Sequence, residues 1–427
     1  MTSPLVHPDG TWDSRIADWR SVGASGDAVA DRPATIFFPA GVHTRTDRLL
    51  ITSDDTVLRG EGRGITFLDF TKSLTDLLGA DPNHSWNQGL VQAKGCKTIT
   101  IRDLTIRFPV VPTAKHHLEA GWNGISVWGC TNVLIQNVDI LNADSGILVE
   151  FGSSAVTLDG IRLSTARMGR DDGEWYGVFT GHHGFEFQRV TNCLLRDFDI
   201  TQRFMHDIST ENASWIVAAH GHALDLSLDH HKSDGTSFYL VDDVVSESLG
   251  RVWKSGGKAS NPAHGGPGNV YYNIRKPDGT PLTTPPPWPS PGIIMETQRD
   301  VRPRSLFAFQ RGEEPYPPTP PEEPPMAKFV VSDRVRTIDE AKIRQGAGTD
   351  KPQIGTQFAG ALGTILSGPV VATGYTYYQV NFDAGTDGWL GEDKLEKVVS
   401  APPLTARQRA EAKLGALGFL PDEIATI

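Results

Sequence analysis

Four segments between residues 99 and 200 share one order of apolar and polar positions. In each, apolar and variable positions alternate up to an Asp, Asn or Gly, after which two more apolar positions follow. Alternation with a period of two is typical of strands that bury one face, and the Asp, Asn or Gly predicts a sharp bend within the strand. The segments are residues 99–106, 133–140, 156–163 and 193–200, and the bends are expected at Asp103, Asn137, Gly160 and Asp197.

The spacing of these segments predicts an all-β, coiled architecture. They begin 34, 23 and 37 residues apart. One coil of a parallel β-helix takes roughly 20–25 residues, so the longer intervals indicate loops that extend from a coil. A β-propeller would show longer blades with a fixed motif, and a β-sandwich would not repeat the bend. We therefore predict a parallel β-helix over residues 1–312.

Two segments outside the repeated coils carry expectations of their own. Trp12, Ile16 and Trp19 recur at helical spacing, which predicts a short N-terminal helix. Residues 306–309, Leu-Phe-Ala-Phe, are expected to cap the end of the coil stack.

Two short runs near the N-terminus add a resemblance to a known protein family. Residues 37–42 are Phe-Phe-Pro-Ala-Gly-Val, and residues 57–62 are Val-Leu-Arg-Gly-Glu-Gly. Together with the coils, they resemble the pectate-lyase-like right-handed β-helix superfamily over about residues 30–310. That resemblance implies a right-handed coil and a protein that acts on polysaccharides, and it is specific for the fold rather than for the reaction.

The C-terminal part of the chain has a different character. Residues 313–326 are rich in Pro and Glu, which predicts an extended, solvated linker. Residues 327–399 resemble a bacterial SH3 domain, a likeness carried by Arg-Gln-Gly at 344–346, Tyr-Gln-Val at 378–380 and Gly-Trp-Leu at 388–390. The resemblance implies a module that binds cell wall or glycan, and a spacer or dimer contact is the alternative. Residues 400–427 are predicted to form a short helical tail.

Composition narrows the classes of partner and compartment. The net charge of -11 argues against nucleic acid as a partner, and the chain has no run of 18 apolar residues that would span a membrane. The N-terminus lacks the charged and apolar regions of a secretory signal. We expect an extracellular protein, either secreted or carried on a phage particle, that is a monomer or a homotrimer. The cysteines start apolar runs and are predicted to be buried core residues: Cys96, Cys130 and Cys193.

Titratable side chains are densest between residues 203 and 257. This stretch holds five of the thirteen histidines, beside several carboxylates and one Arg/Lys pair. Such a concentration predicts an active-site wall. Side chains on neighbouring coils of a β-helix lie roughly 5 Å apart, so residues distant in sequence converge on one sugar of a polymer. A polysaccharide is therefore the expected substrate.

Four short motifs follow the order of those in polygalacturonase-type glycoside hydrolases, which carry Asn-Thr-Asp, Asp-Asp, Gly-His-Gly and Arg-Ile-Lys. The corresponding segments here are Asn-Ala-Asp at 142–144, His-Asp at 206–207, Gly-His-Ala at 221–223 and Arg-Val-Trp-Lys at 251–254. The resemblance implies that Asp144 and Asp207 are the catalytic carboxylates and that His222 supports them. It also implies that Arg251 and Lys254 bind the anionic groups of the substrate.

The motifs depart from the family pattern at three places. His206 replaces the first of the paired aspartates, Ala223 replaces a glycine, and one extra residue separates the Arg from the Lys. Asp225 and Asp229 are therefore competing candidates for the carboxylates. Hydrolysis with inversion requires two carboxyl groups about 6.5–9.5 Å apart.

Elimination on a uronate is the rival chemistry. A lyase needs a cation to neutralise the uronate, a base to take the C5 proton and a donor for the leaving oxygen. Arg203, His206, Arg251 and Lys254 can supply all three, or a Ca²⁺ ion can replace the cationic side chains. Otherwise no cofactor is expected. Hydrolysis is the first prediction, elimination the second, and glycan binding without catalysis, as in a structural tailspike, the third.

A metal site is considered and not predicted. Asp229, His230 and His231 together with His220 and His222 have the composition of a zinc site. However, residues 230 and 231 of a strand point to opposite faces. We therefore assign His230 and His231 to hydrogen bonding with the substrate.

Two further residues are candidates for contact with the sugar, with a plain turn as the alternative for the first and core packing as the alternative for the second. His183 lies in a Gly-His-His-Gly segment that predicts a tight turn at the edge of the substrate groove. Trp253, between the Arg and the Lys of the last motif, offers an aromatic face on which a sugar can stack.

Overall fold

The chain forms two compact units, Met1–Pro317 and Pro318–Ile427. The computed structural model describes residues 3–7, 9–24, 34–81, 87–171, 173, 177–231, 235–256, 262–314 and 328–398. Most of the predicted linker and the whole predicted helical tail, residues 400–427, lie outside the described residues.

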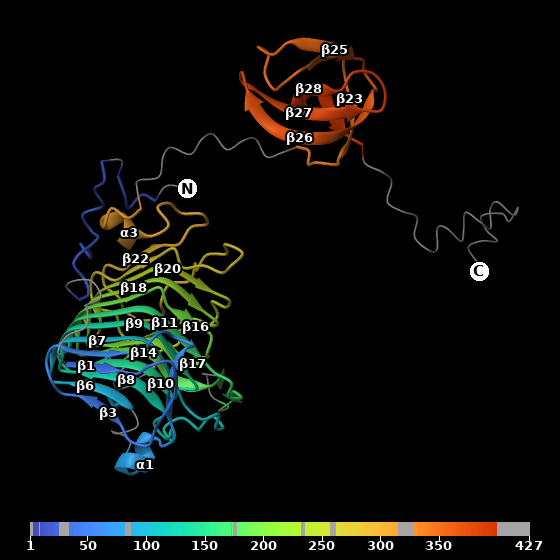
Figure 1. The fold of residues 1–427 in the computed structure, drawn as a ribbon. Coiled ribbons are helices and arrows are strands. Elements are labelled where there is room, and N and C mark those ends of the chain that lie inside the picture. Colours follow the sequence, from blue (N-terminus) through green and yellow to red (C-terminus); the bar gives the residue numbers. More distant parts are fainter. Residues whose placement is uncertain are drawn as a thin grey trace, which may run out of the picture. The chain divides into compact units, whose positions relative to one another are not determined.

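The first unit is a parallel β-helix built of two long sheets (Figure 1). The 13-stranded sheet comprises β1 (Ala34–Phe37), β2 (Gly41–Arg45), β4 (Thr56–Arg59), β5 (Thr66–Phe70), β7 (Lys97–Arg107), β9 (Thr131–Leu141), β11 (Ser154–Ser164), β15 (Thr191–Arg196), β16 (Asp199–Ile200), β18 (Ser214–Ala223), β20 (Ser237–Ser246), β21 (Val270–Tyr272) and β22 (Ile294–Glu296). The seven-stranded sheet comprises β3 (Leu49–Ile51), β6 (Val91–Lys94), β8 (Asn123–Trp128), β10 (Ser145–Glu150), β14 (Gly181–Gln188), β17 (Phe204–Glu211) and β19 (Leu228–His230).

Every strand pairing within these two sheets is parallel. From β8 to β11 the chain passes from one sheet to the other in turn, so each coil contributes a strand to both. The predicted all-β, parallel β-helix is confirmed. Among the described residues, the remaining elements of this unit are helices α1 (Leu74–Leu78) and α3 (Leu306–Gln310) and the antiparallel pair β12 (Arg170–Asp171) and β13 (Val178–Phe179).

The predicted bends fall where the strands of the 13-stranded sheet turn. The backbone φ angles are 57° at Asp103, 54° at Asn137, 65° at Gly160 and 52° at Asp197. This left-handed region is the one that Asn, Asp and Gly tolerate best. The Asn137 side-chain amide donates to Asp103 Oδ1 at 2.7 Å, so the bends of two coils also bond to each other.

Two later coils have the same bend, and in one of them the bend residue is a histidine. His220 in β18 has a φ of 54°, and Asp243 in β20 has a φ of 50°. A histidine at the bend does not mark it in the sequence as Asp, Asn or Gly does. The solenoid therefore continues past the four predicted coils.

Apolar columns fill the interior of the coils. Leu158 of β11 lies between Ile135 of β9 and Leu195 of β15, and all three are fully buried. Full burial of such a side chain stabilises the fold by about 1.5–3 kcal/mol. The predicted burial of the cysteines is confirmed for Cys96, Cys130 and Cys193.

The predicted N-terminal helix is wrong, since residues 12–19 form turns instead. Asp13 and Asp18 accept the backbone N–H groups of Arg15 and Arg20, at 2.9 and 3.1 Å. Such local side-chain bonds compete with helix formation. Ile16 and Trp19 of this segment are nevertheless buried, Trp19 completely, and Trp12 is partly buried.

Residues 306–309 form most of α3, which packs with the N-terminal segment on the outer face of the 13-stranded sheet. Asp242 of β20 accepts the backbone N–H groups of Leu306 and Phe307 at 3.0 and 2.9 Å. Gln310 accepts the Trp19 N–H at 3.0 Å and so ties the two segments together. The helix therefore covers the side of the sheet near β22 rather than closing the interior.

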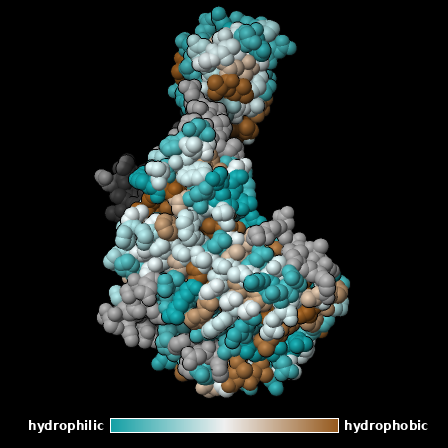
Figure 2. All heavy atoms as spheres, turned by 90° about the vertical axis from the view of Figure 1, so that its left-hand side faces the viewer, coloured by the Kyte–Doolittle hydropathy of each residue, from teal (hydrophilic) through white to brown (hydrophobic). Residues whose placement is uncertain are grey.

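The second unit is a seven-stranded antiparallel sheet around its own small core. Its elements are β23 (Arg334–Thr337), β24 (Ala341–Arg344), β25 (Gln353–Gln357), β26 (Leu362–Ala372), β27 (Tyr375–Phe382), β28 (Gly388–Gly391), the 3₁₀ helix η1 (Glu392–Lys394) and β29 (Leu395–Lys397). Figure 2 shows a hydrophobic area on the face of this unit that is turned toward the viewer. Phe358 and Tyr375 are among the exposed apolar side chains of the unit. The likeness to a bacterial SH3 domain stays a prediction. None of the helices in the described part of the chain is long and apolar enough to cross a membrane.

The bend at Asn137 gives a direct test of the coil geometry. Replacing Asn137 by Val places a β-branched residue at positive φ, which costs of order 1–3 kcal/mol. We expect Asn137→Val to lower the melting temperature of the β-helix unit measured by circular dichroism. Asn137→Gly also removes the side-chain amide, but glycine adopts positive φ without strain. It should therefore lower the melting temperature clearly less than Asn137→Val does. Equal losses for the two variants would contradict the bend as the cause.

Candidate functional site

The candidate site lies on the outer face of the seven-stranded sheet, where successive coils bring histidines and carboxylates together. Strands β14 and β17 pair so that His183 lies beside His206. Three residues further along, Glu186 lies beside Ser209, which in turn lies beside Asp229 of β19. The apolar residues of these strands fill the interior, namely Phe185, Ile208 and Leu228. The acidic side chains that alternate with them therefore point outward.

The Gly-His-His-Gly segment is the start of strand β14 and not the predicted tight turn. A Cβ atom on Gly181 would lie 2.7 Å from Gln202 Nε2, and one on Gly184 would lie 2.5 Å from the Asp207 carbonyl oxygen. Both glycines are needed because the following coil approaches too closely for a side chain. They bring the strand that carries His206 against the strand that carries His183.

The histidine rings form a continuous row. The ring centroids of His182 and His183 lie 4.2 Å apart, those of His183 and His206 lie 5.4 Å apart, and those of His206 and His231 lie 6.2 Å apart. We call this row and its two outward-facing acids the histidine face. Its members are His182, His183, His206, His231, Glu186 and Asp229.

Three of these rings each turn the Nδ1 atom toward a carboxylate. The distance is 3.4 Å from His182 to Glu119 and 3.0 Å from His183 to Glu186. From His206 to Asp229 it is 3.7 Å. One ring nitrogen from each histidine also lies within 4.8 Å of the other two. Among the described residues, this trio is the group that could hold a metal ion.

Burial sets the protonation of the rings. It lowers the pKa of His206 to about 3, although Asp229 acts in the opposite direction, and it lowers the pKa of His182 well below the usual value. Burial also opposes a charge on His183, but the charge and hydrogen bond of Glu186 outweigh it and raise the pKa of that ring. The face therefore combines neutral rings with one that holds a proton more strongly.

Asp229 is the buried anchor of the face. Its carboxylate accepts the Ser209 hydroxyl and the Gly256 N–H, both at 2.7 Å, and contacts His231 Nδ1 at 3.2 Å. Burial disfavours the charged form, but His206, His231 and Ser209 hold the pKa of this carboxyl well below its usual range. Asp229 therefore orients the His231 ring, whose side chain is 28% exposed.

The predicted catalytic residue Asp207 and its neighbours form a buried ionic cluster beside the histidine face. Asp207 accepts the Ser227 N–H at 2.8 Å, and burial raises the pKa of its carboxyl to about 8 despite the opposing charge of Arg251. Asp225 pairs with Arg203 at 2.7 Å and with Arg251 at 3.4 Å. The cluster holds the start of β17 in place.

Arg251 has a different environment from the one predicted for a substrate-binding group. It is buried, and its guanidinium donates to the backbone carbonyls of Phe204 and Met205 at 3.0 and 2.7 Å. Lys254 is half-buried, and its own carbonyl accepts the Ser227 hydroxyl at 3.1 Å. Of this pair, Arg251 therefore stabilises the backbone at the start of β17.

Asp144 is held in a separate buried ion pair. Its carboxylate contacts Arg167 at 2.5 Å and accepts the Trp122 N–H at 2.9 Å. The Arg167 side chain is completely buried. The structure thus places Asp144 and Asp207 in two different sets of contacts.

His222 lies on the other sheet. Its Nδ1 atom contacts Asp199 at 2.9 Å and its Nε2 atom contacts Glu247 at 3.2 Å. It belongs to β18 of the 13-stranded sheet, whereas Asp207 belongs to β17 of the seven-stranded sheet. The predicted support of Asp207 by His222 is not seen in these contacts.

The zinc set considered from sequence is also divided between separate places. His220 faces Asp197 at 3.8 Å on the 13-stranded sheet. His230 is buried and contacts the Tyr271 hydroxyl at 2.7 Å. The expectation that His230 and His231 point to opposite sides is supported, since only His231 lies in the histidine row.

Trp253, expected as a sugar platform, is engaged by other aromatic residues. Its indole N–H donates to the Thr284 carbonyl at 2.6 Å. Its ring packs edge-to-face against Tyr271 at 4.8 Å and Trp288 at 5.8 Å. These contacts give Trp253 a structural role in the packing of neighbouring aromatic residues.

The site residues predicted from sequence did not include His182, Glu119 or Glu186, although His182 lies in the Gly-His-His-Gly segment noted above. The Phe-Glu-Phe alternation at residues 185–187 is a strand pattern that places Glu186 on the polar face, so this residue could have been found. Glu119 belongs to a loop, and its approach to His182 depends on the fold.

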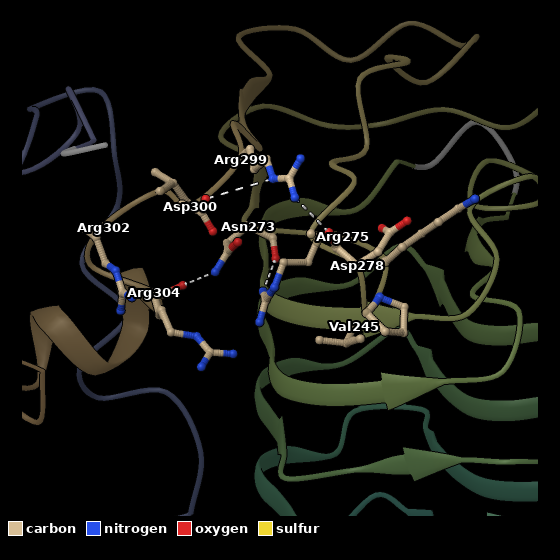
Figure 3. Close-up of a pocket in the computed structure, with 12 residues that line it drawn as sticks. Val245, Asn273, Arg275, Asp278, Arg299, Asp300, Arg302 and Arg304 are labelled. Atoms are coloured by element: carbon tan, nitrogen blue, oxygen red, sulfur yellow. Dashed lines mark hydrogen bonds and ion pairs between the residues drawn. The ribbon is translucent and has the colours of Figure 1, made fainter. Parts of the chain in front are cut away.

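A basic pocket of about 490 Å³ lies at the C-terminal end of the β-helix unit (Figure 3). Arg275 in this pocket is paired with Asp243 at 2.6 Å, while among the described residues no acidic group pairs with Lys276 or Arg302. Two acids and five cationic side chains line it: Asp278, Asp300, Arg275, Lys276, Arg299, Arg302 and Arg304. The pocket is locally basic in a chain whose net charge is -11.

No protein-family model matches this chain, and no curated protein matches it. Among solved structures, similar ones include the endo-xylogalacturonan hydrolase from Aspergillus tubingensis, with 11% identity, a TM-score of 0.38, and coverage of 63% of this chain and 86% of that one. The catalytic domain of a GH87 α-1,3-glucanase has 12% identity, a TM-score of 0.33, and coverage of 63% of this chain and 64% of that one. The exopolygalacturonase from Thermotoga maritima has 12% identity, a TM-score of 0.32, and coverage of 56% and 63%. The chain thus spans less than two thirds of the glucanase domain, and likeness at this level does not identify a reaction.

The Arg167–Asp144 pair predicts a large stability effect. Removing one partner leaves a buried, uncompensated charge, which costs about 3–5 kcal/mol. We expect Arg167→Met to destabilise the β-helix unit by this amount in urea unfolding. The double variant Arg167→Met/Asp144→Leu should recover most of the loss. A loss below about 1 kcal/mol for the single variant would contradict a structural role for the pair.

His222 predicts a pH-dependent contribution to stability. Burial opposes its charge, but hydrogen bonds to Asp199 and Glu247 outweigh this and raise the pKa of the ring above its usual 6.5. The stabilisation is therefore fully present below pH 6.5 and is lost as the pH rises through the higher folded-state value. Because the ring is partly exposed, we expect His222→Gln to cost at most about 1 kcal/mol. The loss should appear in melting curves at pH 5.5 and vanish at pH 8.5. An equal loss at both would contradict the charge pairing.

Proposed function

We propose that this chain cleaves an anionic polysaccharide and that the histidine face is where the bond is broken. The observation that supports this most directly is the row formed by His183, His206 and His231. These residues come from three successive parts of the coil stack, and the centroids of neighbouring rings lie 5.4 and 6.2 Å apart. A polymer lying across the coils would meet polar groups at the spacing of the strands, about 4.8 Å.

His231 is the proposed proton-transfer group. Its ring is the most exposed member of the row, and buried Asp229 contacts its Nδ1 atom at 3.2 Å. An imidazole oriented by a buried carboxylate is a common arrangement for general acid–base catalysis. Gly256 supports the arrangement, because a Cβ atom there would lie 2.2 Å from the His231 ring.

The contacts of the carboxylates favour elimination over hydrolysis. Inverting hydrolysis needs two carboxyl groups on either side of the scissile bond, one of them reached by water. The side chains of Asp144, Asp225 and Asp229 are 5%, 9% and 0% exposed, and Asp207 is 1% exposed as a residue. Each is also bonded to neighbouring protein groups. His231, whose side chain is 28% exposed, is better placed for chemistry on a polymer than these carboxylates.

In the proposed elimination, His231 takes the C5 proton of a uronate and the C4–O bond breaks. A C4=C5 double bond forms in the new non-reducing sugar, and the leaving oxygen gains a proton from the same imidazolium or from water. Arg203 and Lys254 are the partly exposed cations that the sequence analysis assigned to the substrate, although Arg203 also pairs with Asp225 at 2.7 Å. Cations at the site would favour an anionic sugar. The basic pocket at the C-terminal end of the unit is a second place suited to anionic groups.

A polysaccharide screen tests this function. Anionic and neutral polysaccharides are incubated with the chain, and reducing ends and absorbance near 235 nm are recorded together. We expect new reducing ends with a matching rise in absorbance, because elimination produces an unsaturated uronide. New reducing ends without absorbance would favour hydrolysis and contradict elimination. No product from any substrate would favour a glycan-binding protein.

Variants then separate the histidine face from the motif-based assignment. His231→Ala should lower kcat by about 10²–10⁴-fold, the usual contribution of a general acid–base group. Asp207→Asn keeps the shape of a buried carboxyl and should retain activity within about tenfold. The control His222→Ala alters an equivalent ring on the other sheet and should leave kcat unchanged. Loss of activity in Asp207→Asn with full activity in His231→Ala would return the assignment to the carboxylate.

A further inference from the structure

We propose that His182, His183 and His206 bind one divalent transition metal ion through their Nε2 atoms. The three residues come from two adjacent strands of the seven-stranded sheet, β14 and β17. One ring nitrogen of each lies within 4.8 Å of the other two. Imidazole nitrogens are favoured ligands of zinc and its neighbours in the first transition series.

The carboxylates behind the rings are the observation that points to a metal. Histidines that bind metal almost always have the other ring nitrogen bonded to a carboxylate, a carbonyl or water, which fixes the direction of the ligating atom. Here Nδ1 of His183 contacts Glu186 at 3.0 Å, which is hydrogen-bond distance. Nδ1 of His182 lies 3.4 Å from Glu119, and Nδ1 of His206 lies 3.7 Å from Asp229, so these two carboxylates face the rings at ion-pair range. The Nε2 atoms are thus on the opposite edges of the rings.

The backbone holds the three rings close before any ion binds. His183 lies beside His206 in the strand register, and Gly181 and Gly184 allow the two strands to approach. Three nitrogens at about 2.0–2.1 Å from a tetrahedral zinc ion would lie about 3.3 Å from each other. Binding a zinc ion would therefore bring the ring nitrogens, which lie within 4.8 Å of one another, closer together.

Three histidine ligands would leave the fourth position of a tetrahedral zinc ion for another ligand, as in catalytic rather than structural zinc sites. That position would suit an anionic oxygen ligand, such as the carboxylate of a uronate. This last step rests on the proposed function, in which the uronate must be neutralised, whereas the metal site itself does not. His231 is outside the ligand set and remains the proton-transfer group.

Metal binding to the full chain tests the inference. The protein is treated with a chelator and dialysed, and ZnCl₂ is titrated into it by calorimetry, with bound zinc counted by mass spectrometry. We expect one tightly bound zinc ion per chain. His183→Ala and His206→Ala should abolish stoichiometric binding, and Glu186→Gln should weaken it by about 10–100-fold. His220→Ala and His222→Ala change histidines on the other sheet and should bind zinc as the unaltered chain does.

Absence of a bound ion, or binding that survives both His183→Ala and His206→Ala, would overturn the site. Because His206 is buried, folding of each variant is checked by circular dichroism. X-ray absorption of the zinc-loaded unaltered chain gives an answer that does not depend on variants. It should show three imidazole nitrogens at about 2.0–2.1 Å, and fewer than three would also overturn the proposal. A chain that binds zinc in this way but cleaves no polysaccharide would contradict the proposed function alone.

Discussion

The register between stacked coils is the constraint on which the rest of this structure depends. Backbone hydrogen bonds between parallel strands fix neighbouring coils at about 4.8 Å, so side chains can meet only in columns set by that register. The bends at Asp103 and Asn137, with φ near 55°, keep each coil in step with the next. The same register sets His183 beside His206 and, through Ser209, aligns Glu186 with Asp229. The histidine face is therefore a property of the coil stack and not of any single loop.

The fold was largely predictable because its determinants are local. A period of two along the strand and an Asp, Asn or Gly at a left-handed bend can both be recognised within eight residues, and all four predicted bends are at positive φ. The later coils were harder, since His220 takes the place of the expected bend residue. The predicted N-terminal helix was wrong because spacing alone does not register the competing bonds that Asp13 and Asp18 make with the backbone.

The site was predictable only in its composition. The stretch from residue 203 onward does supply His206, Asp229 and His231. The order of motifs, however, could not show which side chains would be buried and bonded to other protein groups in the fold. Arg251 is bonded to backbone carbonyls of the strand it was expected to serve, and Asp144 is neutralised by Arg167. The missing members, His182 and Glu119, meet through a loop and a strand pairing. Burial and strand register decide which contacts these side chains make, and neither can be deduced from a short sequence motif.

The central claim is that the outer face of the seven-stranded sheet, at the histidines, is where a polysaccharide binds and reacts. A crystal structure of His231→Ala soaked with an oligosaccharide from the cleaved polymer tests it most directly. The account predicts sugar density across β14, β17 and β19, with one ring at the position vacated by the His231 side chain. Sugar bound along the 13-stranded sheet, or in the basic pocket alone, would contradict it.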